Sequence, residues 1–119
     1  MNTKPHECWA SDPNARAVKI EVSTEQSLLL PFDQFTFSEL TNEGRQQHLR
    51  LIFATHEVLV RGTCLRRIES AMQRGELSLL TRLPENQKSL VSDGHPVVLQ
   101  ITVNEASSAT AKLTQDRMA

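Results

Sequence analysis

The sequence predicts a small α+β domain, with one amphipathic helix packed on one face of an antiparallel or mixed sheet of about five to six strands. Two observations carry this prediction. Apolar residues alternate with polar ones in several short segments, which is typical of half-buried strands, whereas one segment, at about residues 64–74, has apolar residues at helical spacing. A single helix covers only one face of a sheet, so the other face is expected to be open or to bind a partner.

The chain length of 119 residues suits one domain with one core. Residues 1–15 are mostly polar and include two prolines, so they are expected to form a flexible N-terminal tail. Residues 106–119 are rich in alanine, serine and threonine and are expected to form a flexible C-terminal tail. The single α+β domain is therefore predicted to span residues 16–105.

The first strand is predicted at residues 17–22, where three apolar residues alternate with polar ones. An apolar run follows at residues 28–37. Pro31 lies within this run and predicts a break or a sheet edge, because proline has no backbone N–H to donate to a neighbouring strand.

A hairpin is predicted from the strands at residues 48–53 and 57–61. Pairing Phe53 with Val58 gives an unbroken apolar face and a four-residue turn, because the sequence lacks the Asn-Gly signal of the tightest hairpins. The apolar face of this hairpin is expected to lie against the core.

On the opposite face of the hairpin, the same register places Arg50 directly opposite Arg61, and Ile52 opposite Leu59. Like charges in direct opposition are unfavourable, so both arginines are expected to meet acids from within the fold or from a partner. If the face is open, its apolar pair is exposed and the face resembles an interface.

The helix is predicted to begin after Thr63 as its N-cap and to end at Gly75 as a left-handed C-cap. Its apolar stripe consists of Cys64, Leu65, Ile68, Ala71 and Met72. Cys64 is expected to be a small buried side chain within that stripe.

Two strands are predicted after the helix, at residues 77–83 and 97–103. The apolar face of the last strand is expected to consist of Val97, Leu99, Ile101 and Val103. The core should be mainly aliphatic, because the chain has four phenylalanines, one tryptophan and no tyrosine. The residues expected to form it from the hairpin and the helix are Leu49, Leu51, Phe53, Val58, Val60, Leu65, Ile68 and Met72.

Charge is unevenly distributed along the chain. The net charge of −1 gives the whole chain no general attraction for nucleic acid or membranes. Residues 45–82, however, carry seven arginines against three glutamates. Pairing with acids of the same fold is the simplest explanation, and binding of an acidic partner is the alternative.

No residue is predicted to be catalytic or to bind a metal or a cofactor. The histidines lack the spacing of metal ligands, and the nucleophile-elbow, phosphate-loop and dinucleotide motifs are missing. The chain shows no apolar leader and no run approaching the ~20 apolar residues of a membrane helix. With two widely separated cysteines, these features predict a cytoplasmic protein that does not associate with membranes.

These observations favour a small non-enzymatic protein-interaction or homo-oligomerisation module, whose partner is another protein or a second copy of the chain. The candidate interface residues are Arg50, Ile52, Leu59 and Arg61 on the open face, with Arg66, Arg67 and Arg74 on the helix. One alternative is a nucleic-acid-binding accessory protein that uses the same arginines, although the aromatic platforms of single-strand binders are missing. A small enzyme with an unrecognised site is the other alternative.

Overall fold

The computed structural model describes residues 8–83 and 94–105. The strands and helices, in chain order, are β1 (Trp9–Ser11), β2 (Ala17–Ser23), β3 (Gln26–Pro31), the 3-10 helix η1 (Phe32–Gln34), β4 (Phe35–Glu43), β5 (Gln46–Phe53), β6 (His56–Thr63), α1 (Arg66–Gln73), β7 (Leu77–Thr81) and β8 (Val97–Glu105). The α+β class predicted from the sequence is confirmed. Pro31 ends β3 and separates it from β4, as its missing N–H predicts.

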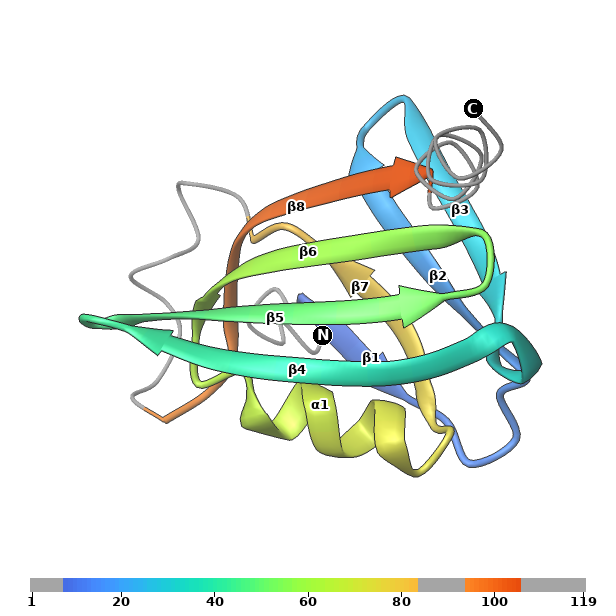
Figure 1. Cartoon of the computed structure of the whole chain (residues 1–119), viewed down its shortest axis with the longest axis horizontal. Coiled ribbons are helices and arrows are strands. Elements are labelled where there is room, and N and C mark those ends of the chain that lie inside the picture. The colour runs from blue at the N-terminus through green and yellow to red at the C-terminus, as the bar shows by residue number, and fades with distance from the viewer. Residues whose placement is uncertain (1–7, 84–93, 106–119) are drawn as a thin grey trace, which may run out of the picture.

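The described strands form two sheets of four strands. Sheet A has the order β1-β7-β2-β3, and sheet B has the order β4-β5-β6-β8. β2 and β7 run parallel, and the other neighbouring pairs are antiparallel. Figure 1 shows sheet B lying across sheet A as a second layer. The prediction of one sheet of five to six strands is wrong, because apolar alternation identifies a strand's buried face but not its neighbours.

Helix α1 contacts β4 of sheet B and β7 of sheet A. It lies alongside β4 and covers one side of the space between the sheets, rather than one face of a single sheet as predicted (Figure 1). The expected left-handed C-cap is confirmed, since Gly75 has a φ of 68°. The N–H groups of Gly75 and Glu76 donate to the carbonyls of Met72 and Ala71, which satisfies the end of the helix.

The start of α1 differs from the prediction. Thr63 is the last residue of β6, and the Leu65 N–H donates to Gln47 Oε1 at 2.7 Å, so a side chain from β5 satisfies an amide at the helix start. Cys64 has a left-handed φ of 55°, and its side chain is exposed. The expectation that Cys64 is buried is wrong, because this residue belongs to the turn before the helix and not to the helical stripe.

The core lies between the inner faces of the two sheets and the apolar face of α1. All eight residues predicted to form it are buried. Sheet A and the residues directly after β7 contribute further buried side chains, namely Val18, Ile20, Leu30, Leu77, Leu80 and Leu83. Cys8 is also buried, with its Sγ 3.3 Å from the Pro96 carbonyl oxygen.

β5 and β6 pair two residues away from the predicted register. Leu51 lies opposite Val58 and Leu49 opposite Val60, with two residues in the turn between the strands. A shift of two residues keeps every side chain on the same face, so alternation alone cannot separate the two registers. The predicted faces are therefore confirmed, whereas the predicted partners and the four-residue turn are wrong.

The backbone of β8 lies close against β6 at Gly62. A Cβ at Gly62 would overlap the carbonyl oxygen of Val97, so only glycine fits at this position of β6. The register shifts by one residue there, which makes Leu99 the additional residue of a β-bulge. Val98 is consequently the buried residue, whereas the sequence predicted Leu99 on the buried face.

Part of the predicted N-terminal tail is a strand. β1 falls within residues 1–15 and pairs with β7, and Trp9 packs against the core. A strand of three residues is too short to show apolar alternation, so the sequence does not reveal it. The predicted C-terminal tail, residues 106–119, lies outside the described residues. Among the helices of the described ranges, none is long and apolar enough to cross a membrane.

The burial of the hairpin and the helix predicts the effect of truncating their side chains. Leu51→Ala and Ile68→Ala should each lower the free energy of unfolding by about 2 to 5 kcal/mol, because each leaves a cavity in the core. Leu29→Ala is the matched control, since Leu29 is 68% exposed and should change stability little. Urea unfolding of the three variants measures the difference, and equal stabilities would contradict the described core.

The pairing of β1 with β7 predicts that the N-terminal segment contributes to stability. Deleting residues 1–15 should lower the free energy of unfolding by about 2 kcal/mol or more, because it removes a buried cysteine and a partly buried tryptophan. Thermal or urea unfolding of the shortened chain tests this expectation. A midpoint equal to that of the full chain would mean that the segment is a tail after all.

Candidate functional site

The outer face of sheet B is the candidate site, because the side chains predicted to form an interface in the hairpin lie there. Alternation along the strands directs every second side chain away from the core. The outward residues are Phe37, Glu39 and Thr41 of β4, His48, Arg50 and Ile52 of β5, Glu57, Leu59 and Arg61 of β6, and Gln100, Thr102 and Asn104 of β8. In the described part of the chain, no strand or helix covers this face (Figure 1).

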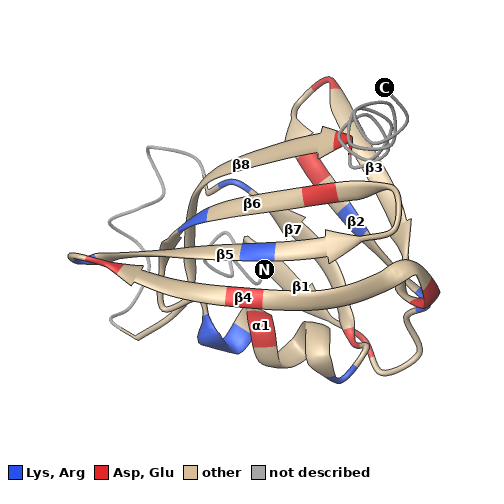
Figure 2. Ribbon diagram, viewed as in Figure 1, with Lys and Arg blue, Asp and Glu red and all other residues tan. Residues whose placement is uncertain are grey.

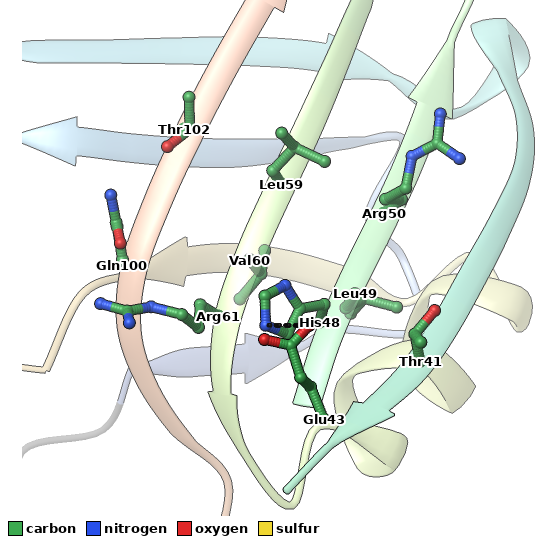
Figure 3. Close-up of a pocket in the computed structure, with 10 residues that line it drawn as sticks. All are labelled: Thr41, Glu43, His48, Leu49, Arg50, Leu59, Val60, Arg61, Gln100 and Thr102. Atoms are coloured by element: carbon green, nitrogen blue, oxygen red, sulfur yellow. Dashed lines mark ion pairs between the residues drawn. The ribbon is translucent and has the colours of Figure 1, made fainter. Parts of the chain in front are cut away.

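A hollow of about 380 Å³ lies on this face. Its lining residues are Thr41, Glu43, His48, Leu49, Arg50, Leu59, Val60, Arg61, Gln100 and Thr102 (Figure 3). Strand alternation and the β6–β8 register bring side chains from all four strands of sheet B to its rim. The hollow therefore unites three of the predicted interface residues, Arg50, Leu59 and Arg61.

Arg50 is neutralised within the fold. Its Nη1 lies 2.9 Å from Glu39 Oε1, and its Nε and Nη2 lie 3.0 Å and 2.9 Å from Glu57 Oε2. The hydrogen bonds that Arg50 donates to Glu39, and secondly to Glu57, raise the pKa of the Arg50 guanidinium above its ordinary value. Arg50 is directly opposite Leu59, not opposite Arg61 as predicted. The sequence predicted acidic partners for Arg50 without identifying them. The structure shows that these partners are Glu39 of β4 and Glu57 of β6.

Arg61 differs from Arg50 in its surroundings. It lies opposite His48 of β5 and Gln100 of β8, and its side chain extends toward Gln100 (Figure 3). Within residues 8–83 and 94–105, Arg61 forms no ion pair. His48 Nε2 lies 3.9 Å from Glu43 Oε2, which is an ion pair only when the imidazole is protonated. The Arg61 side of the hollow therefore offers an exposed guanidinium beside the imidazole of His48 and the amide of Gln100.

Apolar side chains occupy the adjacent part of the same face. Phe37 is 48% exposed and pairs in register with Ile52, while Leu59 lies one row further along β6. Ile52 and Leu59 are half-buried. The prediction that Ile52 faces Leu59 is wrong, because the shifted register places Glu57 opposite Ile52. The structure nevertheless keeps both residues on the outer face and adds Phe37, which the sequence analysis did not single out.

The three helix arginines do not join this site. Arg66 and Arg67 are exposed on α1, outside the lining of the hollow, and Arg74 forms an ion pair with Glu76 at 3.2 Å. Figure 2 shows the charges of α1 along the side of β4, apart from those of β5 and β6. The arginine-rich segment is therefore divided between two surfaces.

Five polar or charged lining residues escaped the sequence analysis, namely Thr41, Glu43, His48, Gln100 and Thr102. β4 gives no signal of its own, because most of its residues are exposed and it lacks apolar alternation. Gln100 and Thr102 alternate with Ile101 and Val103 of the predicted apolar face, and both are exposed in the structure. Only the β6–β8 pairing, which joins distant parts of the chain, places them beside Arg61.

Comparison with known proteins gives no match: no protein-family model, no curated protein and no solved structure is similar to this chain. Among the described residues, no cluster of three or more histidine, cysteine, aspartate or glutamate side chains has the geometry to hold a metal ion.

The different surroundings of Arg50 and Arg61 predict different effects on stability. Arg50→Gln should lower the free energy of unfolding by about 0.5 to 1 kcal/mol, because it removes two partly exposed ion pairs. Arg61→Gln should leave stability unchanged within about 0.5 kcal/mol, as is usual for unpaired surface side chains. Chemical unfolding of the two variants provides the measurement. A larger loss for Arg61→Gln would show that this arginine supports the fold.

Proposed function

We propose that the chain is a protein-interaction module, and that the outer face of sheet B binds a partner surface that carries apolar side chains and a carboxylate. The observation that carries the proposal is the contrast between the two arginines of the hollow. Arg50 has its charge neutralised twice by its own chain, whereas Arg61 exposes its guanidinium and forms no ion pair with any described residue. An acidic side chain of a partner supplies the missing charge.

The apolar part of the face supports the same proposal. Leu59 lines the charged hollow, Phe37 and Ile52 lie beside it, and all three are accessible on an uncovered sheet. Interfaces commonly combine aromatic and aliphatic contacts with arginine at the border. Four strands of about eight residues give a face of roughly 19 by 26 Å. A contact of that size corresponds to a small and reversible interface.

An acidic partner fits this face better than nucleic acid does. The helix arginines lie outside the hollow, so a phosphate backbone crossing the outer face of sheet B meets few unpaired positive charges. Glu39 and Glu57 already pair with Arg50, and Glu43 lies near His48, so Arg61 is the one lining arginine without an ion pair among the described residues. A protein surface tolerates such mixed charge, because its own side chains alternate in sign.

The proposal is tested by fluorescence-anisotropy titration with two labelled peptides. Both carry the same leucines, and one carries glutamates where the other carries lysines. The glutamate peptide should bind, and Arg61→Glu should weaken its binding about tenfold or more, because an attractive pair becomes a repulsive one. Leu59→Asp should weaken binding to a similar extent, since it places a charge in the apolar part of the contact.

Arg66→Glu is the matched control, because it makes the same charge change at an exposed arginine outside the hollow. Equal weakening by Arg61→Glu and Arg66→Glu would mean that binding is a general charge attraction and not a property of this face. A single-stranded oligothymidine serves as the third probe. If it binds in an Arg61-dependent manner while the glutamate peptide does not, the nucleic-acid alternative replaces the proposed function.

A further inference from the structure

The two sheets have four edge strands, and three of them have features that discourage pairing with another chain. β1 is only three residues long, and β3 is short and ends in Pro31. β4 carries Glu39 and Glu43 and has α1 packed along it, with Ser38 Oγ donating to Glu69 Oε2 at 3.1 Å. Short length, proline, charge and a covering helix are the usual protections of an edge strand.

β8, the other edge of sheet B, has a charged residue only at its last position, Glu105, and it is neither short nor interrupted by proline nor covered by a described helix. It is nine residues long, and its sequence from Val97 to Asn104 contains no charged residue and no proline. β-branched residues are frequent in it, which favours the extended conformation. Among the described residues outside β6, one backbone hydrogen bond reaches β8, from the Leu83 N–H to the Val98 carbonyl oxygen at 2.9 Å. The outer edge of residues 99–105 therefore pairs with no described strand.

We propose that β8 is a dimerisation edge, which pairs antiparallel with β8 of a second copy across a two-fold axis at Thr102. A strand that pairs with itself must keep inward residues opposite inward residues, so the axis passes through a residue and not between two. Thr102 is the centre of the seven residues beyond the Leu83 contact. The proposal does not depend on the proposed function of the outer face.

This register makes β8 complementary to itself. Ile101 of one copy lies opposite Val103 of the other on the inner side, and pairs of β-branched residues are favourable across strands. On the outer side Thr102 faces its own counterpart, and Gln100 faces Asn104, whose amide can exchange hydrogen bonds with it. No like charges come into opposition. A second copy is therefore the occupant that this edge fits without any change of sequence.

The experiment measures the oligomeric state of the full chain by sedimentation velocity over a hundredfold range of concentration. The wild type should form a dimer, and Thr102→Glu should raise the dissociation constant about tenfold, because two carboxylates then oppose each other at the axis. Thr102 is exposed, so the substituted chain is expected to keep its fold, which circular dichroism verifies. Ser27→Glu on β3 is the matched control, an exposed position on the edge strand of the other sheet, and should leave the dimer unchanged.

Mixing two variants tests the register itself. Thr102→Lys should likewise raise the dissociation constant about tenfold on its own, and an equimolar mixture of Thr102→Glu and Thr102→Lys should dimerise more tightly than either variant alone, because the axis then joins opposite charges. A wild-type monomer at every concentration overturns the proposal. So does a dissociation constant that Thr102→Glu leaves unchanged, or a mixture that dimerises no more tightly than the single variants.

Discussion

The close approach of β6 and β8 at Gly62 is the constraint on which the outer face of sheet B depends. Because Gly62 has no side chain, the Val97 carbonyl oxygen occupies the space that a Cβ would need. The bulge at Leu99 follows from this contact and resets the alternation of β8. Val98 and Ile101 consequently point into the core, while Gln100 and Thr102 point outward beside β6. One glycine thus determines both the packing of β8 and the polar rim of the hollow.

The charges of the face follow from the same pairing of strands. In the observed register β4 and β6 each bring a glutamate to Arg50, so this arginine is fixed by its own sheet. Arg61 is one residue before Gly62 on the same strand, where its cross-strand neighbours are His48 and Gln100. A guanidinium that forms no ion pair remains available to an outside carboxylate, whereas a doubly paired one does not. Arg50 therefore has a structural role in the hollow, whereas Arg61 is the arginine that can bind a carboxylate of a partner.

The sequence predicted the burial of the hairpin and the helix because burial repeats with the period of the element. Leu51, Val58 and Ile68 lie where that period places them. The sequence did not predict the strand partners, because these depend on pairing between segments and not on the pattern within one segment. A shift of two residues changes every partner of β5 and β6 without changing a face, so Arg50 was matched with Arg61 and not with Leu59. The division of the strands between two sheets is likewise invisible to a local pattern.

The parts of the site that sequence reasoning missed belong to strands without a clear apolar face. β4 is an edge strand whose residues are mostly exposed, so it supplies Thr41 and Glu39 to the site with no periodic signal. β1 is too short for any period, although it adds Trp9 to the packing of sheet A. Edge strands are recognised by the strands they pair with, and apolar alternation within one sequence gives no information on pairing. This is why the core was predictable and the rim of the hollow was not.

The β8 edge and the outer face of sheet B share residues, so dimerisation at the edge affects binding at the face. Gln100 and Thr102 belong to the edge strand and also line the hollow. Pairing of β8 across a two-fold axis at Thr102 joins two outer faces into one sheet surface, with one hollow on each side of the axis. A partner with two acidic segments then meets two Arg61 side chains on a single rigid surface, and the second contact forms at high effective concentration. A weak and small face gains affinity in this way without additional contacts, which is the advantage that dimerisation brings to an interaction module of this size.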